Sequence, residues 1–381
     1  MEDSMEAKKM DDSMNVAKPF KLIISGGGTG GHVFPAIAIA NAVKEFKPDA
    51  EILFVGANGR MEMEKVPAAG YKIIGLKVVG LNRKKWWRNI TLPYKLLLSF
   101  IQTHKILKNF KPDVVVGVGG YASAPTLFLA ERMGIPCLIQ EQNSFPGVTN
   151  RILGKRACKI CVDYEHMEKF FPKEKIVWTG NPIRQDIVNL SIKKEEGLAF
   201  FGLDMDKKTI LIIGGSLGAR SINTSVMACL QSLLEQGYQV LWQTGTYYYA
   251  QARPLIQDLE HVIMVDFIRR MDLAYAAADI VISRGGAIAI SELCVVGKPI
   301  IIIPSPNVAE DHQTKNALAL SSKNAAILLP DDKAQEDLGP TVLALMQDER
   351  RKELMSENIS RLAKTSASTA IANEIFKLQK K

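Results

Sequence analysis

The sequence predicts an α/β protein made of two doubly wound units, each a parallel sheet with helices on both faces. Short apolar runs alternate with helical stretches along almost the whole chain, which is typical of a parallel sheet covered on both sides. A glycine-rich turn follows the first apolar run of each half. The 381 residues are too many for one ordinary core, so two domains are expected.

The first unit is predicted from five apolar runs that are typical of buried strands. They cover residues 21–25, 51–55, 114–118, 136–140 and 159–162. The segment Trp178-Thr179-Gly180-Asn181-Pro182 contains residues that interrupt regular structure, and a charged stretch follows at 193–196. The boundary between the units is therefore expected near residue 182.

The second unit repeats this arrangement, without a repeat of sequence at a fixed period. Its strands are predicted at residues 209–213, 239–243, 261–265, 279–283 and 299–304. Ligands of doubly wound sheets bind beyond the carboxyl ends of the strands. Two such units facing each other would therefore form a cleft that holds the functional residues.

Composition restricts the classes of protein that remain. Apolar residues make up 47% and charged residues 23%, as in globular proteins. The formal charge of +8 favours an anionic partner: nucleic acid, an acidic membrane or a phosphorylated substrate. Residues 1–18 lack the apolar core of a signal peptide, and no apolar run reaches the roughly 18–20 residues that span a bilayer. A cytoplasmic protein with peripheral membrane contact is expected.

Neither a disulfide framework, a metal site nor a cofactor is expected. The chain has five cysteines, and an odd number in a chain of this length is typical of reduced thiols rather than of a set of disulfides. Cys158 and Cys161 form a CxxC pair, but no second pair at zinc spacing accompanies them. The string Asp204-Met205-Asp206 precedes a strand, at the wrong end of the sheet for a metal in the cleft, and is predicted to be a turn.

The first glycine turn, Gly26 to Gly31, follows a strand and precedes a helical run, so its backbone N–H groups can face an anion or a sugar. Its spacing matches the dinucleotide fingerprint, but the second strand ends Phe54-Val55-Gly56-Ala57-Asn58, without the acid that binds ribose. A nicotinamide enzyme is therefore disfavoured. His32, next to the turn, is a candidate general base or hydrogen-bond donor; a helix-capping histidine is the alternative.

Three segments of the second half carry further candidates. In the turn Gly214 to Arg220, Ser216 can reach a diphosphate or simply cap the next helix. In the segment 283–292, Glu292 can accept hydrogen bonds from the vicinal hydroxyls of a ribose, or lie in solvent. The segment 311–317 offers an amide and an imidazole for sugar hydroxyls.

In this order, the segments resemble the MurG family of N-acetylglucosaminyltransferases, in glycosyltransferase family 28. The resemblance covers residues 21 to about 378. It departs at Gly285, where a serine is usual, and at Leu217, where a glutamine is common. The motifs that carry it are Gly27-Gly28-Thr29-Gly30-Gly31-His32, Gln142-Asn143, Asn181-Pro182-Ile183-Arg184, Gly214-Gly215-Ser216, the stretch ending at Glu292, and Gln313 before Asn316-Ala317.

The resemblance implies the GT-B fold, in which two Rossmann-like domains face each other across a cleft. It implies an inverting transfer of N-acetylglucosamine from UDP-N-acetylglucosamine to the 4-hydroxyl of the N-acetylmuramoyl-pentapeptide of undecaprenyl-diphosphate-linked lipid I. The product would be lipid II, for peptidoglycan synthesis; transfer to a diacylglycerol-type acceptor is the alternative. The implied parts are a polar extension at 1–19, an acceptor- and membrane-facing domain at 20–182, a UDP-N-acetylglucosamine domain at 183–362, and a helix crossing back at 363–381.

The resemblance also implies roles for single residues. Contacts to the sugar side of the donor would come from Thr29, Gly30, Gly31 and Asn143, and the base would be His32. Arg184 and Ser216 would bind the diphosphate of the donor. Ile268 would lie by the uracil, and Gln313 would bind the N-acetylglucosamine. The nucleoside pocket would be lined by Ala287, Ile288, Ala289, Ile290, Ser291 and Glu292, with Glu292 on the ribose.

Paired tryptophans among basic residues predict a membrane contact. Aromatic rings and cations suit the headgroup layer of an anionic membrane, and they alternate in Lys84, Lys85, Trp86, Trp87 and Arg88. Stacking on single-stranded nucleic acid is the alternative. The leucine-rich run at 96–101 is expected to pack in the core. The expected location is the cytoplasmic face of the inner membrane, with no nucleic acid bound and with cell-wall synthesis proteins as candidate partners.

Overall fold

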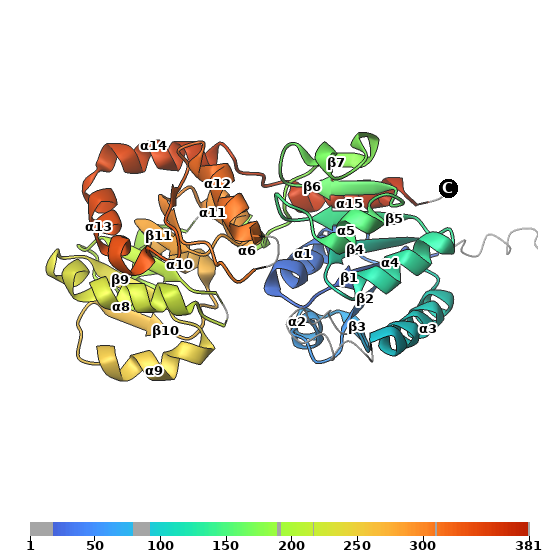
Figure 1. Ribbon diagram of the computed structural model, residues 1–381, viewed down its shortest axis with the longest axis horizontal. Helices are drawn as coiled ribbons and strands as arrows, with labels where there is room; N and C mark the ends of the chain where they lie inside the picture. The colour runs from blue at the N-terminus through green and yellow to red at the C-terminus, as the bar shows by residue number, and fades with distance from the viewer. Residues whose placement is uncertain (1–17, 79–91, 189–191, 216, 309–310, 380–381) are drawn as a thin grey trace, which may run out of the picture.

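The protein consists of two α/β domains that lie side by side, each with a parallel sheet between helices (Figure 1). This confirms the predicted fold class, α/β with two doubly wound domains. The computed structural model describes residues 18–78, 92–188, 192–215, 217–308 and 311–379.

The first domain is built on a seven-stranded parallel sheet in the order β3-β2-β1-β4-β5-β6-β7. One apolar layer lies between the sheet and helices α1 and α15, and the other lies under α3 and α4. The strands are β1 (Lys21–Gly26), β2 (Glu51–Ala57), β3 (Lys72–Leu76), β4 (Val114–Gly119), β5 (Cys137–Glu141), β6 (Lys159–Val162) and β7 (Ile176–Trp178). The helices are α1 (Gly30–Phe46), α2 (Glu62–Ala68), α3 (Leu92–Phe110), α4 (Ser123–Arg132), α5 (Val148–Leu153) and α15 (Ala367–Lys377), with 3-10 turns at Met167–Lys169 and Lys173–Lys175.

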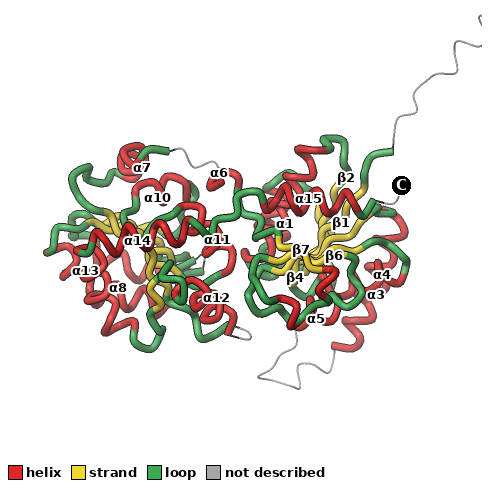
Figure 2. Tube along the Cα trace, turned by 90° about the horizontal axis from the view of Figure 1, so that it is seen from above, coloured by secondary structure: helices red, strands yellow, loops and turns green. Residues whose placement is uncertain are grey.

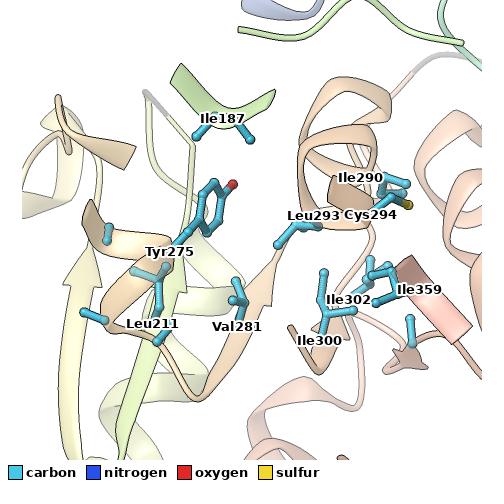
Figure 3. Close-up of a cluster of buried hydrophobic side chains, with 14 of the residues drawn as sticks. Ile187, Leu211, Tyr275, Val281, Ile290, Leu293, Cys294, Ile300, Ile302 and Ile359 are labelled. Carbon is cyan, nitrogen blue, oxygen red and sulfur yellow. The ribbon is translucent and has the colours of Figure 1, made fainter. Parts of the chain in front are cut away.

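The second domain is built on a six-stranded parallel sheet in the order β10-β9-β8-β11-β12-β13. Figure 3 shows one of its apolar layers, in which Tyr275 and Leu293 meet side chains of the strands. The strands are β8 (Thr209–Ile213), β9 (Gln239–Gln243), β10 (Val262–Val265), β11 (Ile280–Ser283), β12 (Ile300–Ile302) and β13 (Ile327–Leu328). The helices are α6 (Gln185–Val188), α7 (Lys194–Phe201), α8 (Arg220–Glu235), α9 (Thr246–Ile256), α10 (Met271–Ala277), α11 (Ala287–Val296), α12 (His312–Ser321), α13 (Ala334–Gln347) and α14 (Glu349–Ser360).

The chain passes between the domains twice. Ile183 and Ile187 already belong to the core of the second domain. After α14 the chain returns, and Ile371 and Ile375 of α15 are fully buried in the core of the first domain. Helix α15 lies beside α1 in both overall views (Figures 1 and 2). The last helix therefore contributes to a core formed mainly by residues more than 200 positions earlier in the sequence.

Three strands, β3, β7 and β13, are not predicted by the sequence, and each lies at the edge of its sheet. These three strands pair on one side only, so their side chains are partly exposed and no long apolar run marks them. The fourth edge strand, β10, was predicted because its four residues are all apolar. The side chains of β7, for example, are partly buried or exposed, and β13 has only two residues. The ten predicted strands are all present.

Candidate functional site

Two glycine turns lie at the carboxyl ends of central strands, one in each domain. The first joins β1 to α1 and the second joins β8 to α8. β1 pairs with β2 on one side and β4 on the other, and β8 pairs in the same way with β9 and β11. Each turn therefore lies where the strand order reverses, which is where ligands of doubly wound sheets bind.

The first turn depends on glycine at Gly26 and Gly28. A Cβ on Gly26 would lie 2.3 Å from Val118 Cγ2, so the neighbouring strand leaves no room for a side chain. Gly28 has a φ of +89°, a backbone conformation that favours glycine. Thr29 then precedes α1 in an extended conformation, and its carbonyl accepts the N–H of Val33. Thr29 and Gly31 remain exposed above the sheet.

His32 lies in the first turn of α1 and is held on two sides. Its Nδ1 is 3.1 Å from Thr29 Oγ1, and its ring is hydrogen-bonded to the backbone of Gly27. Burial lowers the pKa of His32, the hydrogen bond to Gly27 and the charge of Glu62 oppose this, and His312 of the second domain adds to the lowering. The imidazole is therefore mainly neutral at pH 7, in the form that accepts a proton.

Asn143 follows β5 and is held by the buried carboxylate of Glu141, which is 2% exposed. Glu141 accepts hydrogen bonds from the N–H and the side-chain amide of Asn143, at 3.0 and 3.1 Å. It also accepts one from Asn150 Nδ2 at 2.8 Å. One carboxylate therefore fixes the loop between β5 and α5.

Asn316 of α12 connects this loop to the second domain. Its Oδ1 accepts hydrogen bonds from the N–H and the hydroxyl of Ser144, at 3.1 and 2.9 Å. Its Nδ2 donates to the carbonyl of Gly285 at 3.2 Å. Asn316 is fully buried, so these bonds set how the loop that carries Asn143 meets the second domain.

Arg184 and Glu292, both predicted from the sequence, lie together in the second domain. Arg184 Nε is 3.7 Å from Glu292 Oε1 and 3.3 Å from Asp186 Oδ1. Burial raises the pKa of Glu292 to about 7, although the Arg184 charge opposes this. Arg184 Nε and Nη2 are buried and make no hydrogen bond with any residue that the structure describes. The guanidinium therefore retains donors for an anion.

Helix α11 does not present all six of its predicted residues to one pocket. The Ser291 hydroxyl is 3.1 Å from Asp163 Oδ2 and 3.0 Å from Asn181 Nδ2, both in the first half of the chain. Ile290 and Ser291 line a separate cavity of about 550 Å³ at the domain junction, and Ile290 is 2% exposed. A helix turns by about 100° per residue, so a continuous run cannot face one ligand. The structure thus places Ile290 and Ser291 at this second cavity, and their role in a nucleoside pocket stays a prediction.

A cavity of about 790 Å³ opens next to the second glycine turn. Gly214 and Gly218 of the turn line it together with Tyr248, Ser305 and Gln313. Gln313 Oε1 accepts the N–H of Ser305 at 2.8 Å, which fixes the amide at the cavity wall. The second turn and Gln313, far apart in the sequence, thus border one space.

The structure gives a reason for glycine at position 285, where the resemblance predicts a serine. A Cβ there would lie 2.5 Å from the carbonyl oxygen of Gln313, so any side chain would push α12 away. The other departure, Leu217, is 66% exposed. Gly285 therefore permits the close approach of α12 that places Gln313 beside the cavity.

The remaining predictions have mixed outcomes. The side chain of Ile268 is 3% exposed and packs in the core. Ser216 and the segment 84–88 lie outside the described residues. The predicted turn at Asp204 is confirmed, since its Oδ1 accepts the N–H of Asp206 at 2.9 Å. Within the described ranges, no group of three or more His, Cys, Asp or Glu side chains could hold a metal ion.

Helix α3 carries exposed apolar side chains where the sequence predicts core packing. Tyr94, Leu96, Leu97 and Ile101 are 65%, 43%, 57% and 48% exposed, so the prediction for 96–101 is wrong at three positions. The buried face of α3 is formed instead by residues such as Ile106 and Leu107. None of the described helices is long and apolar enough to cross a membrane.

Sequence reasoning missed two of the carboxylates that build this site. Glu62 begins α2 and Glu141 ends β5, so they reach the site from elements far apart in the sequence. For Glu141 a signal existed, because the polar residues Gln140-Glu141-Gln142 end a buried strand, at the edge of the sheet where ligands bind. No comparable pattern marks Glu62.

The two parallel-sheet domains, each with a glycine turn after a central strand, have the GT-B fold. Residues 22–162 match the glycosyltransferase family 28 N-terminal domain, and residues 209–374 match the glycosyltransferase family 28 C-terminal domain. The chain belongs to glycosyltransferase family 28.

Close relatives give a more specific comparison. The chain is 56% identical to a Parabacteroides distasonis protein over 95% of this chain and 99% of the relative, and 53% identical to a Bacteroides thetaiotaomicron protein over 95% and 98%. Both relatives are named UDP-N-acetylglucosamine–N-acetylmuramyl-(pentapeptide) pyrophosphoryl-undecaprenol N-acetylglucosamine transferase. The crystal structure of Acinetobacter baumannii MurG is similar with a TM-score of 0.75 at 26% identity, over 94% of this chain and all of that one.

Proposed function

We propose that this chain transfers N-acetylglucosamine from UDP-N-acetylglucosamine to the 4-hydroxyl of the N-acetylmuramoyl-pentapeptide of lipid I, giving lipid II. The observation that carries the proposal is the 52–56% identity, over nearly the full length, to transferases that bear this name. The geometry of both glycine turns is consistent with such a transfer.

The donor is assigned to the second domain. Glu292 receives the ribose hydroxyls, and Arg184 and Ser216 bind the diphosphate. The two buried guanidinium nitrogens of Arg184 support this role, because a diphosphate would supply the hydrogen-bond acceptors that they lack. The amide of Gln313 lies at the wall of the adjacent cavity, where the N-acetylglucosamine group of the donor would enter.

The reaction is a single displacement that inverts the anomeric carbon. The acceptor oxygen O4 forms a bond to C1 of N-acetylglucosamine while the bond from C1 to the UDP oxygen breaks. The O4 proton passes to His32, whose lowered pKa keeps it neutral and able to accept one. Arg184 stabilises the negative charge that develops on the departing UDP. Thr29, Gly30, Gly31 and Asn143 hold the two sugars in line.

Membrane contact is assigned to the first domain, at the cytoplasmic face of the inner membrane. The exposed apolar side chains of α3, among them Leu97 and Ile101, support this assignment. Helix α3 directly follows the basic and aromatic segment 84–88 in the sequence. An anionic leaflet would attract a chain of net charge +8 and bring it to a lipid-linked acceptor. Cell-wall synthesis proteins are further candidate partners.

The choice of acceptor tests the proposal. Labelled UDP-N-acetylglucosamine is offered with lipid I or with diacylglycerol, each in detergent at matched concentration. Label should move to lipid I and not to diacylglycerol, and UDP-glucose should compete weakly as a donor. Transfer to diacylglycerol in preference to lipid I would overturn the proposal and assign the chain to a lipid glycosyltransferase with a neutral acceptor.

A further inference from the structure

A buried carboxylate lies directly under the first glycine turn. Glu62, at the start of α2, is 1% exposed. Its Oε2 accepts the N–H of Gly28 at 2.8 Å, and its Oε1 accepts the N–H of Ala57 at 2.9 Å. One side chain thus joins the turn after β1 to the end of β2, through two charge-assisted hydrogen bonds.

Two glycines make room for this carboxylate. A Cβ on Gly27 would lie 2.3 Å from Glu62 Cδ, and a Cβ on Gly56 would lie 2.6 Å from Glu62 Cγ. A side chain at either position would displace the carboxylate from the two backbone N–H groups. Gly27 and Gly56 are therefore required by the space that Glu62 occupies, and not only by the backbone conformation of the turn.

The position of Glu62 changes what the first turn can bind. A glycine turn before a helix is an anion site because its backbone N–H groups converge on one point. Here the N–H of Gly28 already donates to an internal carboxylate, and the negative charge of that carboxylate would repel a phosphate. The second domain differs, since its donor site contains the guanidinium of Arg184, with two buried nitrogens that make no hydrogen bond to any described residue.

The same carboxylate acts on His32. Two titratable groups face the imidazole: Glu62 from α2, which favours its charged form, and His312 from α12 of the second domain, which disfavours it. Glu62 is thus fixed by hydrogen bonds at a position from which its charge influences the candidate base.

We propose that Glu62 is a positioning residue for the acceptor site. Its carboxylate occupies the inside of the first glycine turn, so that the turn receives neutral sugar hydroxyls and holds His32 in place. Without this carboxylate, the Gly28 N–H loses its internal acceptor, and the hydrogen bonds that join the turn to the end of β2 are lost. The inference rests on the proposed function, in which the first turn faces the reacting sugars.

The test is Glu62→Gln, with Glu64→Gln as a matched control on the same helix, because the Glu64 side chain is 76% exposed. For Glu62→Gln we expect kcat/KM for lipid I to fall about tenfold to a hundredfold, since a small displacement of reacting groups has effects of this size. The dissociation constant of UDP-N-acetylglucosamine should stay within about twofold, because its nucleotide part binds the other domain. The control should match the wild type in both measurements.

The pH profile separates this role from a loss of stability alone. His32 acts when neutral, so activity declines as the pH falls through its pKa. Because the Glu62 charge raises that pKa, the acid inflection of kcat should move to lower pH in Glu62→Gln. If Glu62→Gln does not fold, Glu62→Asp is measured instead; it keeps the charge, so it should retain the inflection with a lower kcat/KM.

An unchanged kcat/KM for lipid I, or an equal loss of donor binding, would overturn the inference. An inflection that stays at the wild-type pH in folded Glu62→Gln would also overturn it. Failure of the proposed function looks different, because wild-type enzyme would then not transfer label to lipid I at all. The two failures are therefore distinguishable in one set of assays.

Discussion

Donor binding should release protons near neutral pH, through Glu292. Burial holds the pKa of this carboxyl at about 7, so about half of the molecules carry it protonated at pH 7. A ribose that donates two hydrogen bonds to the carboxylate favours its charged form. Affinity for UDP-N-acetylglucosamine should therefore weaken as the pH falls below 7.

The size of the effect follows from the two pKa values. If ribose binding returns the pKa of Glu292 to its ordinary value of 4.5, affinity at pH 6 should be roughly tenfold weaker than at pH 8. Binding at pH 7 should release about half a proton. The same raised pKa acts on stability: the folded protein binds the extra proton, so the contribution of Glu292 to stability falls as the pH rises from about 4.5 to about 7.

Titration calorimetry in two buffers of different ionisation enthalpy measures both quantities. UDP-N-acetylglucosamine is the suitable probe because its diphosphate is esterified at both ends and has no proton that titrates near pH 7. Glu292→Gln should bind the donor more weakly, with no dependence on pH between 6 and 8 from this group. Glu196→Gln, at an exposed position, should behave as the wild type. Wild-type affinity that is constant from pH 6 to 8, or equal proton release by Glu292→Gln, would refute the reasoning.

Three further substitutions test the packing and the surfaces. Gly285→Ser should lower the free energy of unfolding by about 1–3 kcal/mol and weaken donor binding, because its Cβ would lie 2.5 Å from the Gln313 carbonyl oxygen. An unchanged urea unfolding curve would contradict this. Asn316→Ala should lower the free energy of unfolding by about 1–3 kcal/mol, because it leaves the Ser144 N–H without its buried acceptor. The control Asn373→Ala, at an exposed position of α15, should have a smaller effect. Leu97→Glu should leave the melting temperature unchanged and reduce sedimentation with anionic vesicles several-fold; equal sedimentation would argue against α3 as a membrane contact.

The central strands of both sheets could be predicted because they are buried on both faces. Strands such as β4 and β12 consist almost wholly of apolar residues, and this pattern depends on nothing outside the strand. The edge strand β3 begins with an exposed lysine and contains a glycine, since part of it faces solvent. The exposed face of α3 was misjudged for a related reason: leucine content marks a helix with an apolar face, but not what that face meets.

The candidate site could be predicted where glycines in the sequence mark a turn of the backbone. A glycine turn after a strand identifies Thr29 and His32 without knowledge of the fold. The carboxylates under the loops could not be identified, because their partners are backbone N–H groups that only the folded sheet brings near: Glu62 meets Gly28, which is 34 positions away. Ser291 shows a different limit: its motif is continuous in sequence, but the helix turns this residue towards the domain junction.

The central claim is that the first domain carries the catalytic base and the second binds the nucleotide. It is tested most directly by His32→Gln, for which turnover with lipid I and equilibrium binding of UDP-N-acetylglucosamine are measured separately. His104→Gln, at an exposed position of α3, is the matched control. Turnover by His32→Gln should fall about a hundredfold, the size expected for loss of a general base, while donor affinity stays within about twofold of the wild type. Near-normal turnover would remove His32 from catalysis, and a parallel loss of donor affinity would show that the first glycine turn serves the nucleotide.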